Sequence, residues 1–211
     1  MARRFIVVDD HPLFRGALTQ VLAGSAEIRE AAGIDGLIEA LGEDEDVDLV
    51  LLDLNIPGAH GFSGLLLVRA QFPQVPVLVV SGEDGPDLAV RCLELGAAGF
   101  LRKSATAADM RRAVDTVLEG GTWPPDAGTQ AGGAPNPWQR LASLSPQQVR
   151  VLMMMSAGQM NKQIAYELGI AEATVKAHVS AILLKLGVDS RTQAVLLASS
   201  LERSQFAATD R

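Results

Sequence analysis

The sequence is poor in cysteine and has no long apolar run, and both absences limit what the protein can be. It has 211 residues with one cysteine, Cys92, so it cannot form an internal disulfide or a zinc site built from several cysteines. No stretch approaches the ~18 uncharged apolar residues that span a membrane. The first apolar run stops at Asp9, too early for the core of a signal peptide. We therefore expect a cytoplasmic protein with no membrane partner, and a Cys92 that is buried on a helix.

The charge of the chain is unevenly distributed. The formal net charge is −7, yet residues 1–120 hold 10 basic and 19 acidic residues, whereas residues 139–211 hold 8 basic and 5 acidic ones. With 48% hydrophobic residues, a chain of this length suffices for one large or two small packed domains. An acidic first part and a basic second part favour two domains, of which the second is compatible with nucleic acid.

Four short apolar runs in the first part are each followed by residues suited to chemistry. The runs occupy residues 5–8, 49–52, 77–80 and 99–102, and the residues that follow them are Asp9 with Asp10, Asp53, Ser81 and Lys103. Such runs predict buried strands of a parallel sheet, which carries its functional groups beyond the carboxyl ends of the strands. One acid in that position is commonly a turn former or a helix cap. Polar residues suited to chemistry at the ends of all four runs favour a functional site instead. Because crowded carboxylates repel unless a cation joins them, the cluster predicts a divalent metal and an anionic ligand.

Helical segments alternate with these strands up to residue 120. A fifth, weaker strand is expected at residues 28–32, and helices are expected at residues 13–23, 35–41, 63–71, 87–95 and 106–118. This alternation predicts a doubly wound α/β domain with a five-stranded parallel sheet over residues 1–120. Residues 121–138, rich in glycine and proline, predict a flexible linker with an average end-to-end distance of roughly 23 Å. Trp123 and Trp138 are expected either to pack its two ends onto the domains or simply to cover local surface.

Residues 139–211 show the pattern of a small all-α domain with four helices. Ser145 and Gln148 form a capping box, with Pro146 at the first helical position. The helices are expected at residues 146–157, 162–168, 172–186 and 191–201. The second and third helices are separated by a short turn at residues 169–171, which is the layout of a helix-turn-helix.

The helix predicted at residues 172–186 has an apolar face and a face of small residues. The apolar face carries Val175, Val179, Ile182, Leu183 and Leu186, and the opposite face carries Ala173, Ala177, Ser180, Ala181 and Leu184. Small side chains flanked by donors such as Lys176 allow a helix to enter the major groove of DNA. An ordinary amphipathic helix would show the same periodicity, but the preceding helix and glycine turn favour DNA binding.

Both halves of the chain resemble known domains. Residues 1–120 resemble the receiver domain of two-component response regulators, a flavodoxin-like fold, on the segment Val-Asp-Asp-His-Pro-Leu-Phe-Arg at positions 8–15. Residues 139–204 resemble the LuxR-type helix-turn-helix domain, with Leu-Ser-Pro at 144–146, Asn-Lys-Gln-Ile-Ala at 161–165 and Thr-Val-Lys-Ala-His at 174–178. In this order the two domains resemble the NarL/FixJ subfamily of response regulators.

The resemblance implies a phosphorylation site in the first domain. Asp53 would be the phosphoacceptor, and Mg²⁺ would be held by Asp9, Asp10, Asp53 and the backbone carbonyl of Asn55. Lys103 would pair with the acyl phosphate, and Ser81 and Phe100 would be the switch residues. The residue chemistry agrees, because phosphoryl transfer needs a carboxylate nucleophile, a metal that offsets charge and a cation at the phosphoryl oxygens.

The resemblance also implies a set of DNA-binding residues in the second domain. They are Lys162, Thr174, Val175, Lys176, Ala177, Ser180 and Lys185. Among them, Lys176, Ala177 and Ser180 would face bases, and Thr174 and Lys185 would serve phosphates. Ala177, Ser180 and Leu184 depart from the larger or basic side chains common in the family, which implies fewer phosphate contacts.

Together these features predict a transcription regulator, and not an enzyme, that a histidine kinase phosphorylates and that binds promoter DNA as a homodimer. RNA polymerase stays open as a further partner. Two alternatives also stay open: an adaptor that acts through protein contacts, and an aspartyl-phosphate hydrolase. Such hydrolases place the nucleophile in a D-x-D motif, whereas the first strand here ends in Asp9-Asp10-His11. The acidic receiver is expected to cover the DNA-facing helix until phosphorylation releases it.

Overall fold

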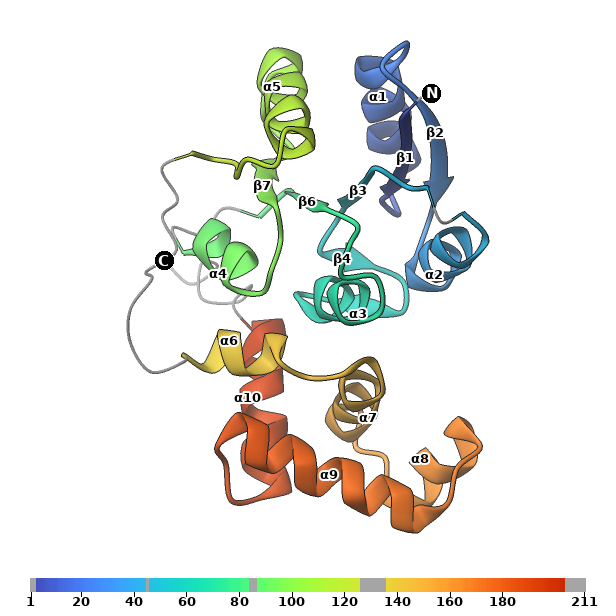
Figure 1. The fold of residues 1–211 in the computed structure, drawn as a ribbon, viewed down its shortest axis with the longest axis vertical. Coiled ribbons are helices and arrows are strands. Elements are labelled where there is room, and N and C mark those ends of the chain that lie inside the picture. The colour runs from blue at the N-terminus through green and yellow to red at the C-terminus, as the bar shows by residue number, and fades with distance from the viewer. Residues whose placement is uncertain (1–2, 45, 84–86, 126–135, 204–211) are drawn as a thin grey trace.

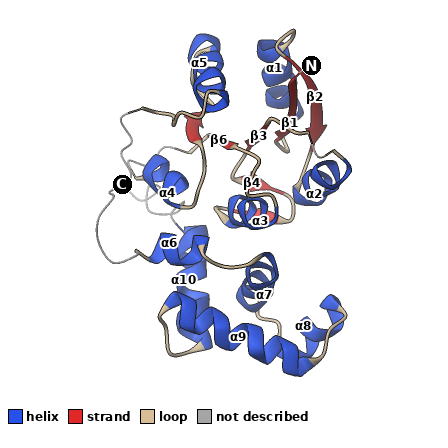
Figure 2. Cartoon of the chain, in the orientation of Figure 1, coloured by secondary structure: helices blue, strands red, loops and turns tan. Residues whose placement is uncertain are grey.

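A computed structural model shows two parts of different architecture (Figure 1). It describes residues 3–44, 46–83, 87–125 and 136–203. All strands lie in the first part, and the part from residue 136 onward is helical (Figure 2). No described helix combines the length and the apolar character that crossing a membrane requires.

Five parallel strands form the sheet of the first part. They are β1 (Arg3–Val8), β2 (Ala26–Ala31), β3 (Leu49–Leu52), β6 (Val77–Ser81) and β7 (Gly99–Arg102), in the order β2-β1-β3-β6-β7. The chain runs from β1 outward to β2, crosses back to β3 and then continues in the opposite direction. The carboxyl ends of β1 and β3 therefore flank the point where the winding reverses, which is where open α/β sheets bind ligands.

Helices cover both faces of this sheet, because successive residues of a strand point to opposite faces. One face is covered by α1 (Pro12–Leu22) and α5 (Ala107–Leu118), and the other by α2 (Ile34–Glu43), α3 (Ser63–Gln71) and α4 (Leu88–Glu94). Phe5 and Val7 pack toward the first pair, whereas Ile6 and Val8 pack toward the second group. Cys92 of α4 is fully buried. The predicted doubly wound α/β fold is confirmed.

Two local elements of the first part differ from the prediction. A hairpin of β4 (Asn55–Ile56) and β5 (Ala59–His60), which was not predicted, follows β3. Its strands are too short to show an alternating pattern, and its turn depends on Gly58 at φ +83°. Strand β2 begins two residues before the predicted strand. As an edge strand with mostly exposed or half-buried residues, it has only a weak apolar pattern.

The second part contains the four predicted helices and one more. The helices are α6 (Pro137–Ala142), α7 (Pro146–Ser156), α8 (Asn161–Leu168), α9 (Glu172–Leu186) and α10 (Arg191–Arg203). Helix α6 was not predicted, because six residues are too few for an apolar period. Its start did carry a signal: Asn136 and Gln139 form a capping box, like the predicted box of Ser145 and Gln148 that begins α7.

The predicted linker is structured at both of its described ends. The N–H of Trp123 donates to the carbonyl of Ala98 at 3.2 Å, and the Trp123 carbonyl accepts from the N–H of Phe100 at 2.8 Å. At the other end, Trp138 lies in α6 and its ring contacts that of Phe62. The predicted packing of the two tryptophans onto domains is therefore confirmed, whereas residues 126–135, the middle of the predicted linker, lie outside the described residues.

The two parts are in contact. In Figure 1, α6 and α7 lie against α4 and α3 of the first part. The apolar cluster on that side of the sheet continues into the helical part, so that Leu66 of α3 and Leu152 of α7 belong to one cluster. The helical part is therefore packed onto the side of the sheet that carries α3 and α4.

We expect Gly58→Ala to destabilise the protein more than Gly24→Ala. Both glycines have φ near +82°, but a Cβ at Gly58 would lie 2.6 Å from Cγ2 of Ile34, whereas one at Gly24 would meet nothing within 4 Å. Gly24→Ala should cost about 1 kcal/mol through its positive φ alone. Gly58→Ala should cost about 1–3 kcal/mol more through the clash. Urea unfolding followed by circular dichroism measures both losses, and equal losses would contradict the close packing of Gly58 on Ile34.

Candidate functional site

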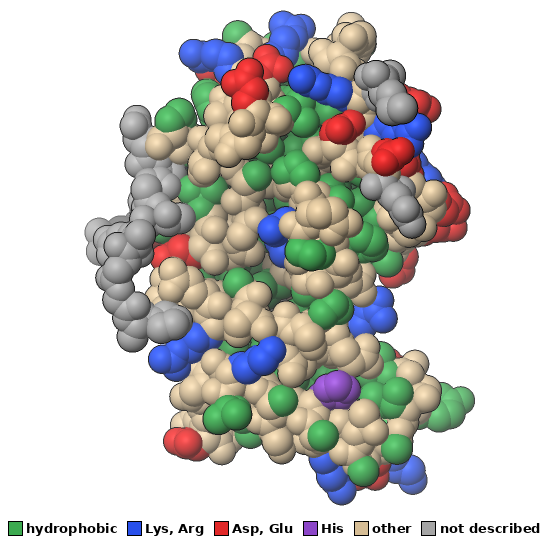
Figure 3. Space-filling model, viewed as in Figure 1, with side chains coloured by type: hydrophobic (Ala, Val, Ile, Leu, Met, Phe, Trp, Pro, Cys, Tyr) green, Lys and Arg blue, Asp and Glu red, His purple; other side chains and the backbone are tan. Residues whose placement is uncertain are grey.

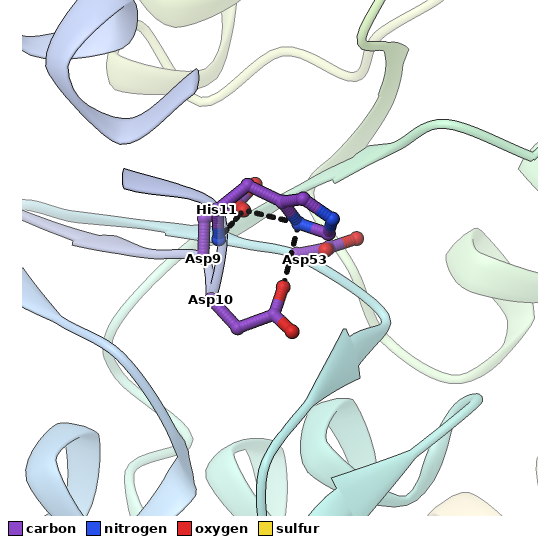
Figure 4. Close-up of side chains that lie close together, drawn as sticks. All are labelled: Asp9, Asp10, His11 and Asp53. Carbon is purple, nitrogen blue, oxygen red and sulfur yellow. Dashed lines mark hydrogen bonds and ion pairs between the residues drawn. The ribbon is translucent and has the colours of Figure 1, made fainter. Parts of the chain in front are cut away.

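Two carboxylates are buried next to each other where the winding of the sheet reverses. Asp9 follows β1 and Asp53 follows β3, with exposed fractions of 1% and 4%. The N–H of Asp53 donates to the carbonyl of Val8 at 2.9 Å, which continues the strand pairing beyond β3 and fixes the two acids relative to each other. Figure 4 shows both with Asp10 and His11 in one group. The structure thus brings together the acids that stand at these predicted strand ends.

The ammonium of Lys103 lies between these two carboxylates. Its Nζ is 2.6 Å from Oδ2 of Asp9 and 2.8 Å from Oδ2 of Asp53. The backbone N–H of Lys103 donates to the carbonyl of Ser81 at 2.7 Å, so the residue is anchored on the neighbouring strand end. Its Nζ also lies 4.9 Å from the ring centroid of Phe14, within range of a cation–π interaction. One positive charge therefore faces two buried negative charges.

The pKa values of Asp53 and Lys103 reflect this excess of negative charge. Burial raises the pKa of Asp53 above its usual value, because it disfavours the charged form. The hydrogen bond and charge of Lys103 oppose the rise, and the charge of Asp9 adds to it. Burial works to lower the pKa of Lys103, but hydrogen bonds and charge interactions with Asp53 and Asp9 outweigh it and raise that pKa. The Lys103 ammonium therefore stays charged, and this single positive charge offsets only one of the two carboxylate charges.

The donor atoms around this pocket fit a small divalent cation. One ligand atom from each of Asp9, Asp10, His11 and Asp53 lies within 4.8 Å of the others. Mg²⁺ prefers oxygen ligands and retains several waters, so the three carboxylates are suitable and need not complete its shell. The predicted fourth ligand, the carbonyl of Asn55, follows in β4 directly beyond β3.

His11 is a member of this group to which the sequence assigned no role. Its Nδ1 lies 2.6 Å from Oδ1 of Asp10 and 3.2 Å from Oδ1 of Asp9, and its backbone N–H donates to Asp9 at 2.8 Å. These contacts orient the two acids relative to each other. Its position directly after two acids at a strand end is the feature of the sequence that could have indicated this role.

The predicted switch residues lie in buried positions. Ser81 is fully buried at the end of β6, and its Oγ accepts a hydrogen bond from the N–H of Glu83 at 3.1 Å. The Glu83 carboxylate in turn accepts from Nδ2 of Asn55 at 2.7 Å. Phe100, 7% exposed, packs in the apolar cluster on the α3–α4 side of the sheet. Glu83 was not predicted to take part, because nothing local to its sequence pairs it with a residue 28 positions away.

The second part exposes the face of α9 that was predicted to meet DNA. Thr174, Lys176, Ala177 and Ser180 are exposed, and Lys162 is exposed on α8. Gly169 in the left-handed conformation, φ +65°, ends α8 and allows the turn into α9. On the face of the molecule that Figure 3 shows, acidic side chains gather over the first part of the chain, and few lie over the helical part.

Two of the predicted DNA-binding residues are placed differently by the structure. Val175 is 0% exposed and packs in the core of the helical part, so the prediction that it contacts DNA is wrong for its side chain. The Nζ of Lys185 donates to the carbonyl of Ser143 at 2.8 Å and to Oε1 of Gln148 at 2.9 Å. These bonds connect α9 to the start of α7, whereas the residue as a whole is exposed, and its predicted contact with a phosphate stays a prediction.

The expected covering of α9 by the receiver is also wrong. In Figure 1 the receiver contacts α6 and α7, and α9 lies at the far end of the molecule. The exposure of Lys176 and the 83% exposure of Leu184 agree with this position. The apolar part of the interface explains the outcome, because α3 and α7 bury apolar surface against each other whereas the small-residue face of α9 offers little of it.

Relatives of known class match nearly the whole chain. A glycerol metabolism activator of Pseudomonas putida is 40% identical, over 96% of this chain and 98% of the relative. The nitrate/nitrite response regulator protein NarL of Escherichia coli K12 is 31% identical, over 90% of this chain and 92% of the relative. The fold is similar to that of the response regulator RcsB in its DNA complex, with a TM-score of 0.56 at 22% identity over 95% of this chain and 99% of the other.

Two family models match in tandem. Residues 5–115 match the response regulator receiver domain, and residues 142–198 match the bacterial regulatory proteins of the luxR family. The first match coincides with the part that holds the acidic pocket, and the second begins before α7 and ends within α10. The chain therefore belongs to the NarL/FixJ-type response regulators, in which a receiver domain precedes a LuxR-type DNA-binding domain.

Proposed function

We propose that this response regulator accepts a phosphoryl group from a histidine kinase on Asp53, with Mg²⁺ bound at Asp9, Asp10 and Asp53, and then binds promoter DNA as a homodimer through α9. The observation that carries the proposal is the group at the winding reversal: two buried carboxylates, Lys103 at 2.6 and 2.8 Å from them, and Asp10 beside them. The relatives are regulators of the same two-domain class, which supports the DNA-binding step.

The phosphoryl transfer can be derived from the residues of the pocket. A carboxylate oxygen of Asp53 attacks the phosphorus of a phosphohistidine. The new O–P bond forms as the P–N bond breaks, and the histidine nitrogen leaves with the bonding pair. Lys103, already 2.8 Å from Asp53, is placed to pair with the oxygens of the transferred group. Bound Mg²⁺ would offset negative charge on the phosphoryl oxygens.

The response to phosphorylation would begin at Ser81. Its hydroxyl now accepts from the N–H of Glu83 and has a proton available for a phosphoryl oxygen. Adding a doubly charged group beside Asp53 also places negative charge near the Asn55–Glu83 hydrogen bond. Both effects change the interactions of Glu83, at the start of the segment that leads from β6 to α4.

Two other functions explain less of the structure. A hydrolase of aspartyl phosphates would carry its nucleophile in a D-x-D motif after the first strand, whereas β1 is followed here by Asp9-Asp10-His11. An adaptor that acts only through protein contacts would not require the exposed face of Thr174, Lys176 and Ser180 beside a helix-turn-helix. We therefore assign the chain to transcription control and propose no catalytic turnover.

Asp53→Asn should abolish phosphorylation by acetyl phosphate with Mg²⁺, because the amide lacks the nucleophilic oxygen. Mass spectrometry of the intact protein should show one added phosphoryl group on the native chain and none on the variant. Asp115→Asn, an exposed acid on α5, is the matched control and should be labelled like the native chain. Acid-stable or acyl-phosphate labelling of the Asp53→Asn protein would show that the acceptor is another residue.

Ser81→Ala should permit phosphorylation but weaken its effect. The substitution leaves the acids and Lys103 in place and removes the hydroxyl that would bond the phosphoryl group. Labelling by acetyl phosphate is expected near the native level, and the gain in DNA affinity on phosphorylation is expected to shrink severalfold. Fluorescence anisotropy with labelled duplex DNA measures the gain. A full gain in the labelled variant would remove Ser81 from the switch.

Lys176→Ala should weaken DNA binding by the phosphorylated protein. Loss of a base contact would cost about 1–3 kcal/mol and relax discrimination at one position, whereas loss of a phosphate contact would weaken all sequences and lower the salt slope by about one. The ion pair with Glu172, 3.1 Å, is exposed, so the fold should be unaffected. Arg150→Ala removes an exposed charge from α7 and is the control. Equal affinities of the Lys176→Ala and Arg150→Ala proteins would refute the proposed orientation of α9.

A further inference from the structure

Leu184 is a large apolar side chain on the exposed side of α9. It is 83% exposed, and it follows the exposed Ala177 and Ser180 at helical spacing, three and then four residues along the chain. Side chains with that spacing lie on one face of a helix. The opposite face, with Val175 and Ile182, is buried in the core of the helical part. Leu184 therefore extends the face of α9 that the proposed function directs to DNA.

The position of Leu184, and not its exposure alone, makes it informative. Single exposed leucines are common on protein surfaces and have no general meaning. Leu184, however, belongs to neither apolar cluster of the described residues, and α9 lies at the end of the molecule away from the receiver (Figure 1). Contact with DNA would remove its apolar surface from water, which is favourable. The side chain is thus available to the ligand of this face.

Helix α9 has few side chains that can identify a base by hydrogen bonding. It contains no arginine, asparagine or glutamine, three of the residues that bind a purine edge through two hydrogen bonds. The ammonium of Lys176 lies 3.1 Å from the carboxylate of Glu172. The hydroxyl of Ser180 can pair with more than one kind of base. Hydrogen bonding alone therefore gives this face little power to distinguish sequences.

The major groove of DNA presents one apolar group, the 5-methyl group of thymine. A leucine packed against that methyl removes apolar surface of both partners from water. Against another base, the same leucine would cover an amino group or an oxygen and leave it without a hydrogen-bond partner, which is unfavourable. An apolar side chain on this face consequently favours thymine over the other three bases.

Resting on the function proposed above, we infer that Leu184 is a specificity-determining residue that recognises a thymine methyl group in the major groove. Ala177 adds a smaller apolar contact. Because seven residues of helix rise about 10 Å and successive bases are ~3.4 Å apart, the two residues face positions roughly three base pairs apart. The DNA that this protein binds should therefore carry a thymine where Leu184 meets each half-site.

Deoxyuridine, which differs from thymidine only by the absence of the 5-methyl group, tests this contact directly. Full-length protein treated with acetyl phosphate and Mg²⁺ is used to enrich duplexes from a pool with a randomised central segment. The enriched sequence is then synthesised once with thymine and once with deoxyuridine, and fluorescence anisotropy gives both affinities. The native protein should bind the thymine duplex about fourfold more tightly for each half-site in contact, the effect of burying one methyl-sized group.

Leu184→Ala should lower this ratio of the two affinities by about the same factor, because the shorter side chain does not reach the methyl group. Leu13→Ala, which truncates a 91% exposed leucine on α1, is the matched control. It should leave the ratio unchanged, whatever its effect on the affinity for either duplex. Comparing ratios between proteins cancels any effect of deoxyuridine on the shape of the duplex.

Leu184→Lys should replace the apolar contact by a contact with phosphate. The slope of log affinity against log salt concentration should become steeper by about one, and duplexes of unrelated sequence should bind more tightly. The preference for thymine over deoxyuridine should fall as it does in Leu184→Ala. Circular dichroism should show the native fold for both variants, since the side chain is exposed. An unchanged salt slope would place residue 184 away from the DNA and overturn the inference.

The outcomes separate the two proposals. Absence of binding to any duplex by the phosphorylated native protein would overturn the proposed function and this inference with it. Binding to duplexes that show no enrichment of thymine would overturn the inference alone. So would an equal loss of affinity for the thymine and deoxyuridine duplexes in Leu184→Ala, which is the result expected if Leu184 contacts a protein instead.

Discussion

The receiver is organised around the interaction of the Lys103 ammonium with the buried carboxylates of Asp9 and Asp53. Two acids on neighbouring strand ends would repel each other strongly at this depth, and each would be costly to keep charged. The cation between them makes the arrangement tolerable. One ammonium does not neutralise these two carboxylates and the neighbouring Asp10. Burial still raises the pKa of Asp53. The pocket is stable and yet suited to a further cation and an incoming phosphoryl group.

The position of this pocket decides which parts of the molecule can respond to it. Both loops that leave it carry polar contacts, from Asn55 to Glu83 at one end and from α4 to α6 at the other. The α1–α5 face of the sheet has its own separate apolar cluster. The side bearing α3 and α4 shares its cluster with the DNA-binding domain. The helical part therefore shares its apolar core with the α3–α4 side of the sheet and not with the α1–α5 side.

The helical domain separates its structural and its DNA-facing groups by helix face. Val175 and Ile182 bury one side of α9, and Lys185 bonds to Gln148 and Ser143 at its flank, so that α9 is held firmly against α7. The opposite side keeps small or polar residues such as Ala177 and Ser180 in solvent. Because α9 is held through its buried side, its exposed face is not needed for packing. Such a face can fit into a groove of DNA.

Much of this protein is determined by local sequence. The apolar runs that end at Asp9, Asp53, Ser81 and Lys103 predict the strands, and chain order with the parallel topology places their ends at one edge. The end of α3 follows from the proline two residues beyond it, Pro73, and the bounds of α9 from its apolar period and from Gly187, because helix formation depends on neighbours within one or two turns. The second domain's capping box at Ser145 is equally local.

Only the tertiary structure decided how distant groups are paired. The Lys185 ammonium bonds to the carbonyl of Ser143 and to the amide of Gln148. Glu83 bonds to Asn55, and Trp138 contacts Phe62 and Arg91. The local sequence does not predict these contacts, because each depends on how whole helices and strands pack against one another. The same holds for the direction in which α9 faces. The sequence identifies the helix suited to DNA, but the burial of apolar surface between α3 and α7 determines that the receiver leaves it exposed.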